Sequence, residues 1–139
     1  MSDTETIHAT TVSIGGRAVM LLGPSGSGKS DLALRLIDRG AVLVADDYTH
    51  LQRSGDMLVA SAPPTIAGRI EVRSLGIIPV EHVDSMPVVL AVRLKPATER
   101  MPERETEQFA SVSVRTLVLD PRPASAPLVI EHALRHDLP

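Results

Sequence analysis

The chain has 139 residues, 43% hydrophobic and 22% charged, which fits one globular domain and excludes a disordered chain. Its net charge of −3 gives no basic surplus for nucleic acid, and no apolar run approaches the ~20 residues of a membrane span. Cysteine is absent, which excludes disulfides and thiol nucleophiles, and the polar N-terminus has no apolar segment typical of a secretory signal. We therefore expect a cytoplasmic protein that binds neither nucleic acid nor membranes.

The first half of the chain predicts a strand–turn–strand–loop–helix–strand succession. Residues 7–14 are rich in Thr, Val and Ile, Gly15 and Gly16 form a tight-turn pair, and residues 17–22 (RAVMLL) read as a buried strand. A Gly-rich loop follows, and then apolar positions at helical spacing predict a helix over 31–39 that stops at Gly40. Residues 41–45 (AVLVA) predict a short buried strand that ends in Asp46 and Asp47.

The second half is more mixed. Residues 48–61 predict a hairpin around a Ser-Gly-Asp turn, whereas 65–80 alternate short apolar pieces with glycines, which is consistent with short helical turns between strands. Strands are predicted over 88–94 and 112–119, a charged solvated loop over 96–108, a linker over 120–127 and a terminal helix over 128–138. This order indicates an α/β fold, with α+β as the alternative.

The segment GPSGSGKS matches the phosphate-binding pattern G-x-x-x-x-G-K-[ST] in full, between a buried strand and an amphipathic helix. Its glycines let backbone N–H groups approach phosphate oxygens, and the helix turns its positive end to the same anion. We expect the lysine to reach the β and γ phosphates of ATP and the last serine to hold Mg²⁺. The alternative is a Gly/Ser turn with an incidental lysine. The expected nucleotide-binding residues are Gly23, Ser25, Gly26, Ser27, Gly28, Lys29 and Ser30.

Asp46 and Asp47 end the strand that follows the phosphate-loop helix. A carboxylate at such a strand end can hold Mg²⁺, and a second can act as a base toward a hydroxyl nucleophile. The alternative is a pair of solvated turn residues that begin the next hairpin. The pair ends the very next strand after the phosphate-loop helix, whereas in many phosphate-loop NTPases the acidic strand end comes much later in the chain. This spacing points to a smaller group of kinases.

Together, His8, the loop and helix GPSGSGKSDLALRLIDRG, the strand AVLVADD and the segment RIEVRSLGI resemble the catalytic C-terminal domain of HPr kinase/phosphorylase. Members of that family transfer phosphate from ATP to a serine of HPr, a phosphocarrier of the phosphotransferase system, and remove it by phosphorolysis. Their core resembles the nucleotide-binding domain of phosphoenolpyruvate carboxykinases. The resemblance is to short proteobacterial forms that lack a separate N-terminal domain. We expect residues 1–139 to form one phosphate-loop kinase domain with a shortened C-terminal end.

The resemblance also implies roles at matching positions. Asp46 would take the proton of the acceptor serine, with His8 and Lys29 as the other catalytic residues near the phosphates. Ser30, Asp47 and Glu71 would hold Mg²⁺, although the division of roles between the two aspartates stays open. The expected partner is HPr or an HPr-like carrier protein, and the resemblance favours a homo-oligomer.

Two other functions compete with a protein serine kinase. The same phosphate loop could serve a nucleotide-sensing module that controls a partner, such as a two-component sensor pathway, without phosphate transfer. It could also serve a small-metabolite kinase in which 96–108 is a lid. With one Tyr and one Phe in the whole chain, base stacking is not evident and GTP stays open beside ATP.

Overall fold

The computed structural model describes residues 3–96 and 99–136 and contains eleven strands, two α-helices and one short 3₁₀ helix within them. The strands are β1 (Thr4–Ile7), β2 (Ala9–Ile14), β3 (Arg17–Leu22), β4 (Val42–Ala45), β5 (Thr49–Ser54), β6 (Met57–Ser61), β7 (Arg69–Val72), β8 (Gly76–Pro79), β9 (Ser85–Leu94), β10 (Glu105–Phe109) and β11 (Val112–Leu119). The helices are α1 (Lys29–Asp38), η1 (Pro64–Ile66) and α2 (Ala126–Arg135).

The first half follows its local sequence signals closely. β2 and β3 pair antiparallel around the two glycines of the predicted turn, and β5 and β6 form the predicted second hairpin. α1 begins at Lys29, two residues before the predicted start, and buries Leu32, Ala33 and Leu36 on one face. The α/β class is confirmed by one large mixed sheet that carries both helices.

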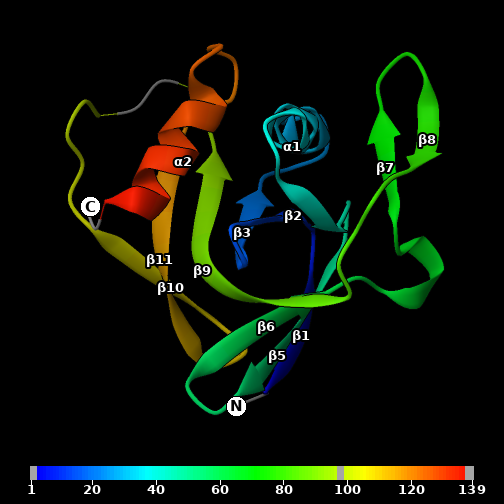
Figure 1. Ribbon diagram of the computed structural model, residues 1–139. Helices are drawn as coiled ribbons and strands as arrows, with labels where there is room; N and C mark the ends of the chain where they lie inside the picture. Colours follow the sequence, from blue (N-terminus) through cyan, green and yellow to red (C-terminus); the bar gives the residue numbers. More distant parts are fainter. Residues whose placement is uncertain (1–2, 97–98, 137–139) are drawn as a thin grey trace.

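The large sheet has the order β1-β5-β6-β9-β3-β2-β4, with β11 paired to β9 and β10 to β11 (Figure 1). The ten-residue strand β9 joins its parts, because its first half pairs antiparallel with β6 and its second half runs parallel to β3 and β11. β7 and β8 form a separate two-stranded sheet beside α1.

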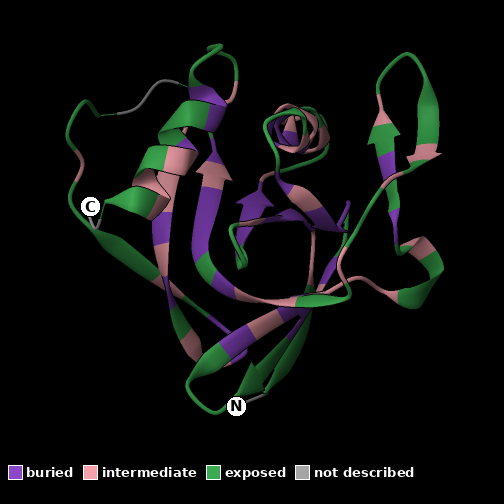
Figure 2. Ribbon diagram, viewed as in Figure 1, coloured by how far each residue is buried: buried purple, intermediate pink, exposed green. Residues whose placement is uncertain are grey.

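Two apolar clusters hold these layers together (Figure 2). One lies between the helices and the sheet and includes Leu21, Leu36, Leu90 and Ile130, each at most 1% exposed. The other gathers Met20, Leu51 of β5, alternate residues of β6 and the end of β10 on the opposite face. Both rely on aliphatic side chains, as expected for a chain almost without aromatic residues.

The strand topology brings three segments that are distant in sequence to one end of the large sheet. β2 lies antiparallel to both β3 and β4, so β3 and β4 run parallel and their carboxyl ends face the same way. The phosphate loop follows β3, the aspartate pair follows β4, and His8 lies immediately before β2. All three therefore meet at one end of the sheet, where α1 begins.

Four sequence predictions are corrected. The segment 96–108 is not wholly a loop, because β10 occupies Glu105–Phe109 and pairs with β11. The single strand predicted over 7–14 is divided at His8, and β1 leaves the first hairpin to pair with β5. The segment 65–80 holds the β7–β8 hairpin after one short helical turn. The terminal helix spans Ala126–Arg135 rather than 128–138: it begins two residues earlier and ends before His136, which is extended, and residues 137–138 lie outside the described residues.

Candidate active site

The loop between β3 and α1 folds as a phosphate cradle. The Ser27 amide donates to the Pro24 carbonyl at 3.1 Å, and Gly28 caps α1 with a φ of 97°, where a side chain would be strained. Gly23 is equally constrained, since an added Cβ would lie 2.5 Å from the Ser27 Oγ. The first N–H groups of α1 have no partner within the helix, so the loop and the positive helix end face the same space.

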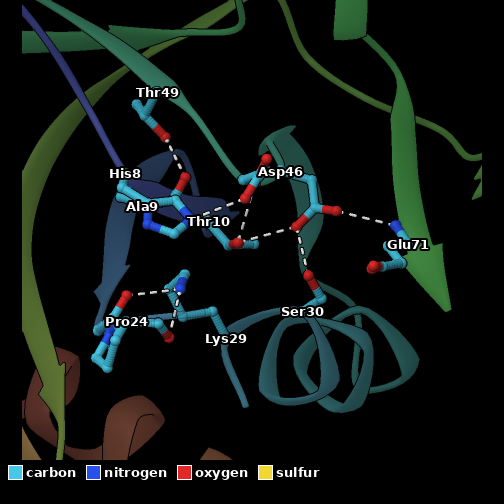
Figure 3. Close-up of polar contacts among 11 residues, drawn as sticks. His8, Ala9, Thr10, Pro24, Lys29, Ser30, Asp46, Thr49 and Glu71 are labelled. Atoms are coloured by element: carbon cyan, nitrogen blue, oxygen red, sulfur yellow. Dashed lines mark hydrogen bonds and ion pairs between the residues drawn. The ribbon is translucent and has the colours of Figure 1, made fainter. Parts of the chain in front are cut away.

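Lys29 lies folded back into this loop. Its side chain donates to the carbonyl oxygens of Gly23 at 2.6 Å and Pro24 at 3.0 Å, and the residue is only 6% exposed (Figure 3). Burial lowers the pKa of Lys29 below its ordinary value, and the nearby carboxylates of Asp47 and Asp46 oppose that shift. The ammonium is thus held in the loop by backbone dipoles, at the place where phosphate oxygens are expected.

Asp46 is the buried hub of the site (Figure 3). Its Oδ1 accepts hydrogen bonds from the Thr10 hydroxyl at 2.9 Å and the Ser30 hydroxyl at 2.7 Å. Its Oδ2 accepts from the Glu71 backbone N–H at 2.9 Å. At 6% exposure, this one carboxylate ties β2, α1 and β7 together.

Asp47 lies next to Asp46 but faces the solvent. Its φ of 69° turns the chain at the strand end, and its side chain is 61% exposed. The Oδ1 lies 2.8 Å from the Nε2 of His8, which forms an ion pair when the imidazole is protonated. The Tyr48 ring stacks against the His8 ring, with centroids 5.2 Å apart. Sequence reasoning missed Tyr48, whose position beside the aspartate pair was the only signal.

These groups share one cavity of about 580 Å³. His8, Lys29, Ser30, Asp47 and Glu71 all line it, so the structure brings together the predicted catalytic and metal-binding residues other than the buried Asp46. Glu71 contributes a backbone N–H to Asp46. Within the described ranges, no three His, Asp or Glu side chains are close enough to form a ready metal cluster.

The family model described as the HPr serine kinase C-terminal domain matches residues 1–134. The chain belongs to this family. It is 39% identical over 132 residues to the HPr kinase/phosphorylase of Caldanaerobacter subterraneus, which covers 85% of this chain and 43% of that protein. The HPr kinase/phosphorylase of Bordetella petrii is 34% identical over 133 residues, covering 86% of this chain and 43% of that protein.

The fold agrees with this family membership. The solved structure of the HPr(Ser) kinase/phosphatase from Coxiella burnetii matches with a TM-score of 0.81 and 31% identity, covering 94% of each chain. The chain spans less than half the length of the two HPr kinase/phosphorylases named above. No helix within residues 3–96 and 99–136 is long and apolar enough to cross a membrane.

The donor set of this site fits a nucleotide with Mg²⁺. The Ser30 hydroxyl and the Asp46 carboxylate lie 2.7 Å apart, and oxygen ligands of this kind suit a small hard cation. In the loop itself, the buried Ser27 Oγ has no hydrogen-bond partner, so the cradle holds a polar atom that is left unsatisfied by the protein.

The two aspartates differ in exposure and in hydrogen bonding. A base for an incoming serine must be reached by that hydroxyl, yet Asp46 is buried and both its oxygens already accept hydrogen bonds from the protein. Asp47 is open to the cavity and is oriented by His8. The geometry therefore leaves the Asp47 carboxylate accessible to an incoming hydroxyl and encloses the Asp46 carboxylate among protein donors.

Proposed function

We propose that this chain is an ATP- and Mg²⁺-dependent protein serine kinase domain whose acceptor is HPr or an HPr-like carrier. One observation carries the proposal: the phosphate loop, the Ser30–Asp46 hydrogen bond and the His8–Asp47 pair lie together at one end of the sheet. The phosphate loop and the His8–Asp47 pair also line one cavity. The names of the similar proteins, HPr kinase/phosphorylase and HPr(Ser) kinase/phosphatase, support the same chemistry.

The nucleotide phosphates would lie along the loop. The backbone amides from Gly23 to Ser30 and the N-terminus of α1 would bind phosphate oxygens, and Lys29 would leave the Gly23 and Pro24 carbonyls to contact the transferred group. Ser30 would hold Mg²⁺, and Asp46, whose carboxylate accepts a hydrogen bond from the Ser30 hydroxyl, would orient that hydroxyl from behind. The cation would supply charge neutralisation for the phosphates. Glu71, on the wall of the same cavity, remains a proposed further oxygen ligand.

In our proposal Asp47 is therefore the base, and Asp46 lies on the Mg²⁺ side of the site. The acceptor serine would donate its hydroxyl proton to the open Asp47 carboxylate as its oxygen bonds to the γ-phosphorus. The bond between that phosphorus and the bridging oxygen of the departing ADP would break. His8, 2.8 Å from Asp47, would orient the carboxylate, and Tyr48 would hold the imidazole in place.

The direct test is transfer of label from γ-labelled ATP to a purified HPr-like carrier, with Mg²⁺ present. Lys29→Ala serves as the blank, because it removes the buried ammonium of the loop. Arg53→Ala is the matched control, since that arginine lies on β5, donates to the Gly55 carbonyl and to the Ser111 carbonyl in the β10–β11 turn, and does not line the cavity. Label on a carrier serine with wild type and Arg53→Ala, but not with Lys29→Ala, is expected.

The competing functions give different results in the same experiment. A folded wild-type domain that binds ATP but labels no carrier would support the nucleotide-sensing module. Turnover on small metabolites, with no protein acceptor labelled, would support the metabolite kinase.

A further inference from the structure

A second cavity lies against the phosphate loop and has no part in the chemistry described above. It measures about 740 Å³, within the range of small-molecule sites in proteins. The loop residues Pro24, Gly26, Ser27 and Gly28 form one wall, and the end of β9 with the connection between β11 and α2 forms the others. Its lining is more apolar than that of the cavity with His8 and Asp47.

The two cavities share the loop and diverge from it. Gly26, Gly28 and Asp31 line both, whereas His8, Asp47 and Glu71 line only the first. In Figure 1 the β7–β8 hairpin lies on one side of α1, and the connection into α2 lies on the other. The shared loop thus offers a nucleotide whose terminal phosphate faces Asp47 a continuous path to the second cavity.

The outer wall of this second cavity is fixed rather than loose. Arg35, on α1, donates from its guanidinium to the carbonyl oxygens of Pro121 at 2.5 Å and Pro123 at 3.3 Å. Its Nε lies 3.2 Å from the Asp31 carboxylate of the same helix. The connection after β11 is thus bound to the helix that carries the phosphate loop, which makes the cavity a preformed site.

Arg122 offers this cavity a flat surface. Its guanidinium donates to both oxygens of Asp120, at 3.0 and 2.9 Å, and the backbone N–H of Arg122 donates to the same carboxylate. The plane is therefore held in one orientation while the side chain stays 71% exposed. The two aromatic residues of the chain are elsewhere, since Tyr48 stacks on His8 and Phe109 is buried in the core.

We infer that this second cavity is the nucleoside subsite and that the nucleobase stacks on the guanidinium plane of Arg122. A planar guanidinium is the side chain that replaces an aromatic ring as a stacking partner. Stacking reads the face of a base and not its edge, so the ligand class is a nucleoside triphosphate rather than adenine in particular. This inference rests on the proposed function, because it places the same nucleotide.

The test compares ATP with inorganic tripolyphosphate, which has the phosphates without the nucleoside. Each is titrated with Mg²⁺ by calorimetry into wild type, Arg122→Ala, Arg122→Lys and the control Arg53→Ala. We expect Arg122→Ala to weaken ATP about three- to tenfold and to leave tripolyphosphate unchanged. Arg122→Lys keeps the charge but not the plane, so it should show most of the same loss.

Three results would overturn the inference. Unchanged ATP affinity in Arg122→Ala would remove the stacking partner, and equal losses for ATP and tripolyphosphate would make Arg122 a phosphate contact. Wild-type ATP affinity in Arg122→Lys would show that charge, and not the plane, matters. If wild type and Arg53→Ala bind neither compound, the proposed function itself fails, which is a distinct outcome from the failure of the subsite.

Discussion

Removal of the Asp46 carboxylate is the perturbation that the structure describes most fully. Its two oxygens accept from Thr10, Ser30 and the Glu71 backbone in a site only 6% exposed. Asp46→Ala leaves all three donors without this acceptor. Both hydroxyls can turn toward other acceptors, but the Glu71 N–H cannot, and an orphaned buried donor costs about 1–3 kcal/mol.

We therefore expect Asp46→Ala to lower the free energy of unfolding by about 3–5 kcal/mol, summing the orphaned N–H and the two hydroxyl bonds at about 1 kcal/mol each. That is a large part of the roughly 5–15 kcal/mol of a typical domain. Asp46→Asn should cost only about 1–2 kcal/mol. Its amide nitrogen can face the two hydroxyls, which then accept, while its oxygen still accepts from Glu71.

Urea unfolding followed by far-ultraviolet circular dichroism measures both variants, since the chain has no tryptophan for fluorescence. The expected order of midpoints is wild type, then Asp46→Asn, then Asp46→Ala. A midpoint for Asp46→Ala equal to that of wild type would refute the role of Asp46 as a buried hub. An Asp46→Asn midpoint as low as that of the alanine variant would refute the argument from rotating hydroxyls.

Three further predictions concern the surrounding structure. Gly28→Ala places a side chain at a φ of 97°, so it should lower the unfolding free energy by about 1–2 kcal/mol in the same urea assay. The hydrogen bond from Arg93 holds the pKa of Glu107 below its ordinary value of 4.5. The pair therefore stabilises the fold above that pH and loses this effect as the pH falls through the pKa of the folded state. The difference in urea midpoint between wild type and Glu107→Gln should accordingly shrink from pH ~7 to pH ~3. Tyr48→Ala should slow phosphate transfer severalfold, because His8 loses its stacking partner, whereas Tyr48→Phe should restore the rate; an unchanged rate in the alanine variant would exclude a positioning role.

Local signals account for what the sequence predicted well. The β2–β3 hairpin, the phosphate loop and α1 are adjacent in the chain, and their turn glycines and helical spacing need no distant partner. β10 was not predicted because its local sequence carries no strand signal. Three of its five residues are exposed and all but Phe109 are polar or charged, so only pairing with β11 makes this segment a strand.

The site was predicted as a set of residues but not as a set of contacts. His8 and Asp47 are 39 positions apart, and only the sheet order brings them within 2.8 Å. The burial of Asp46 beside the open Asp47 depends on the turn after β4, which no residue pattern specifies. Glu71 touches Asp46 through its backbone N–H, a group that every residue type except proline would supply.

The most direct measurement compares Asp46→Asn and Asp47→Asn in the HPr-like carrier assay, with ATP binding measured on the same preparations. We predict that Asp47→Asn binds MgATP as wild type does and loses phosphate transfer by at least about a hundredfold, the lower bound for a lost general base. Asp46→Asn should instead weaken MgATP binding, because it alters the hydrogen bond that the Ser30 hydroxyl donates to Asp46. Full transfer by Asp47→Asn, with transfer lost in Asp46→Asn at unchanged MgATP affinity, would contradict this division of roles and restore Asp46 as the base.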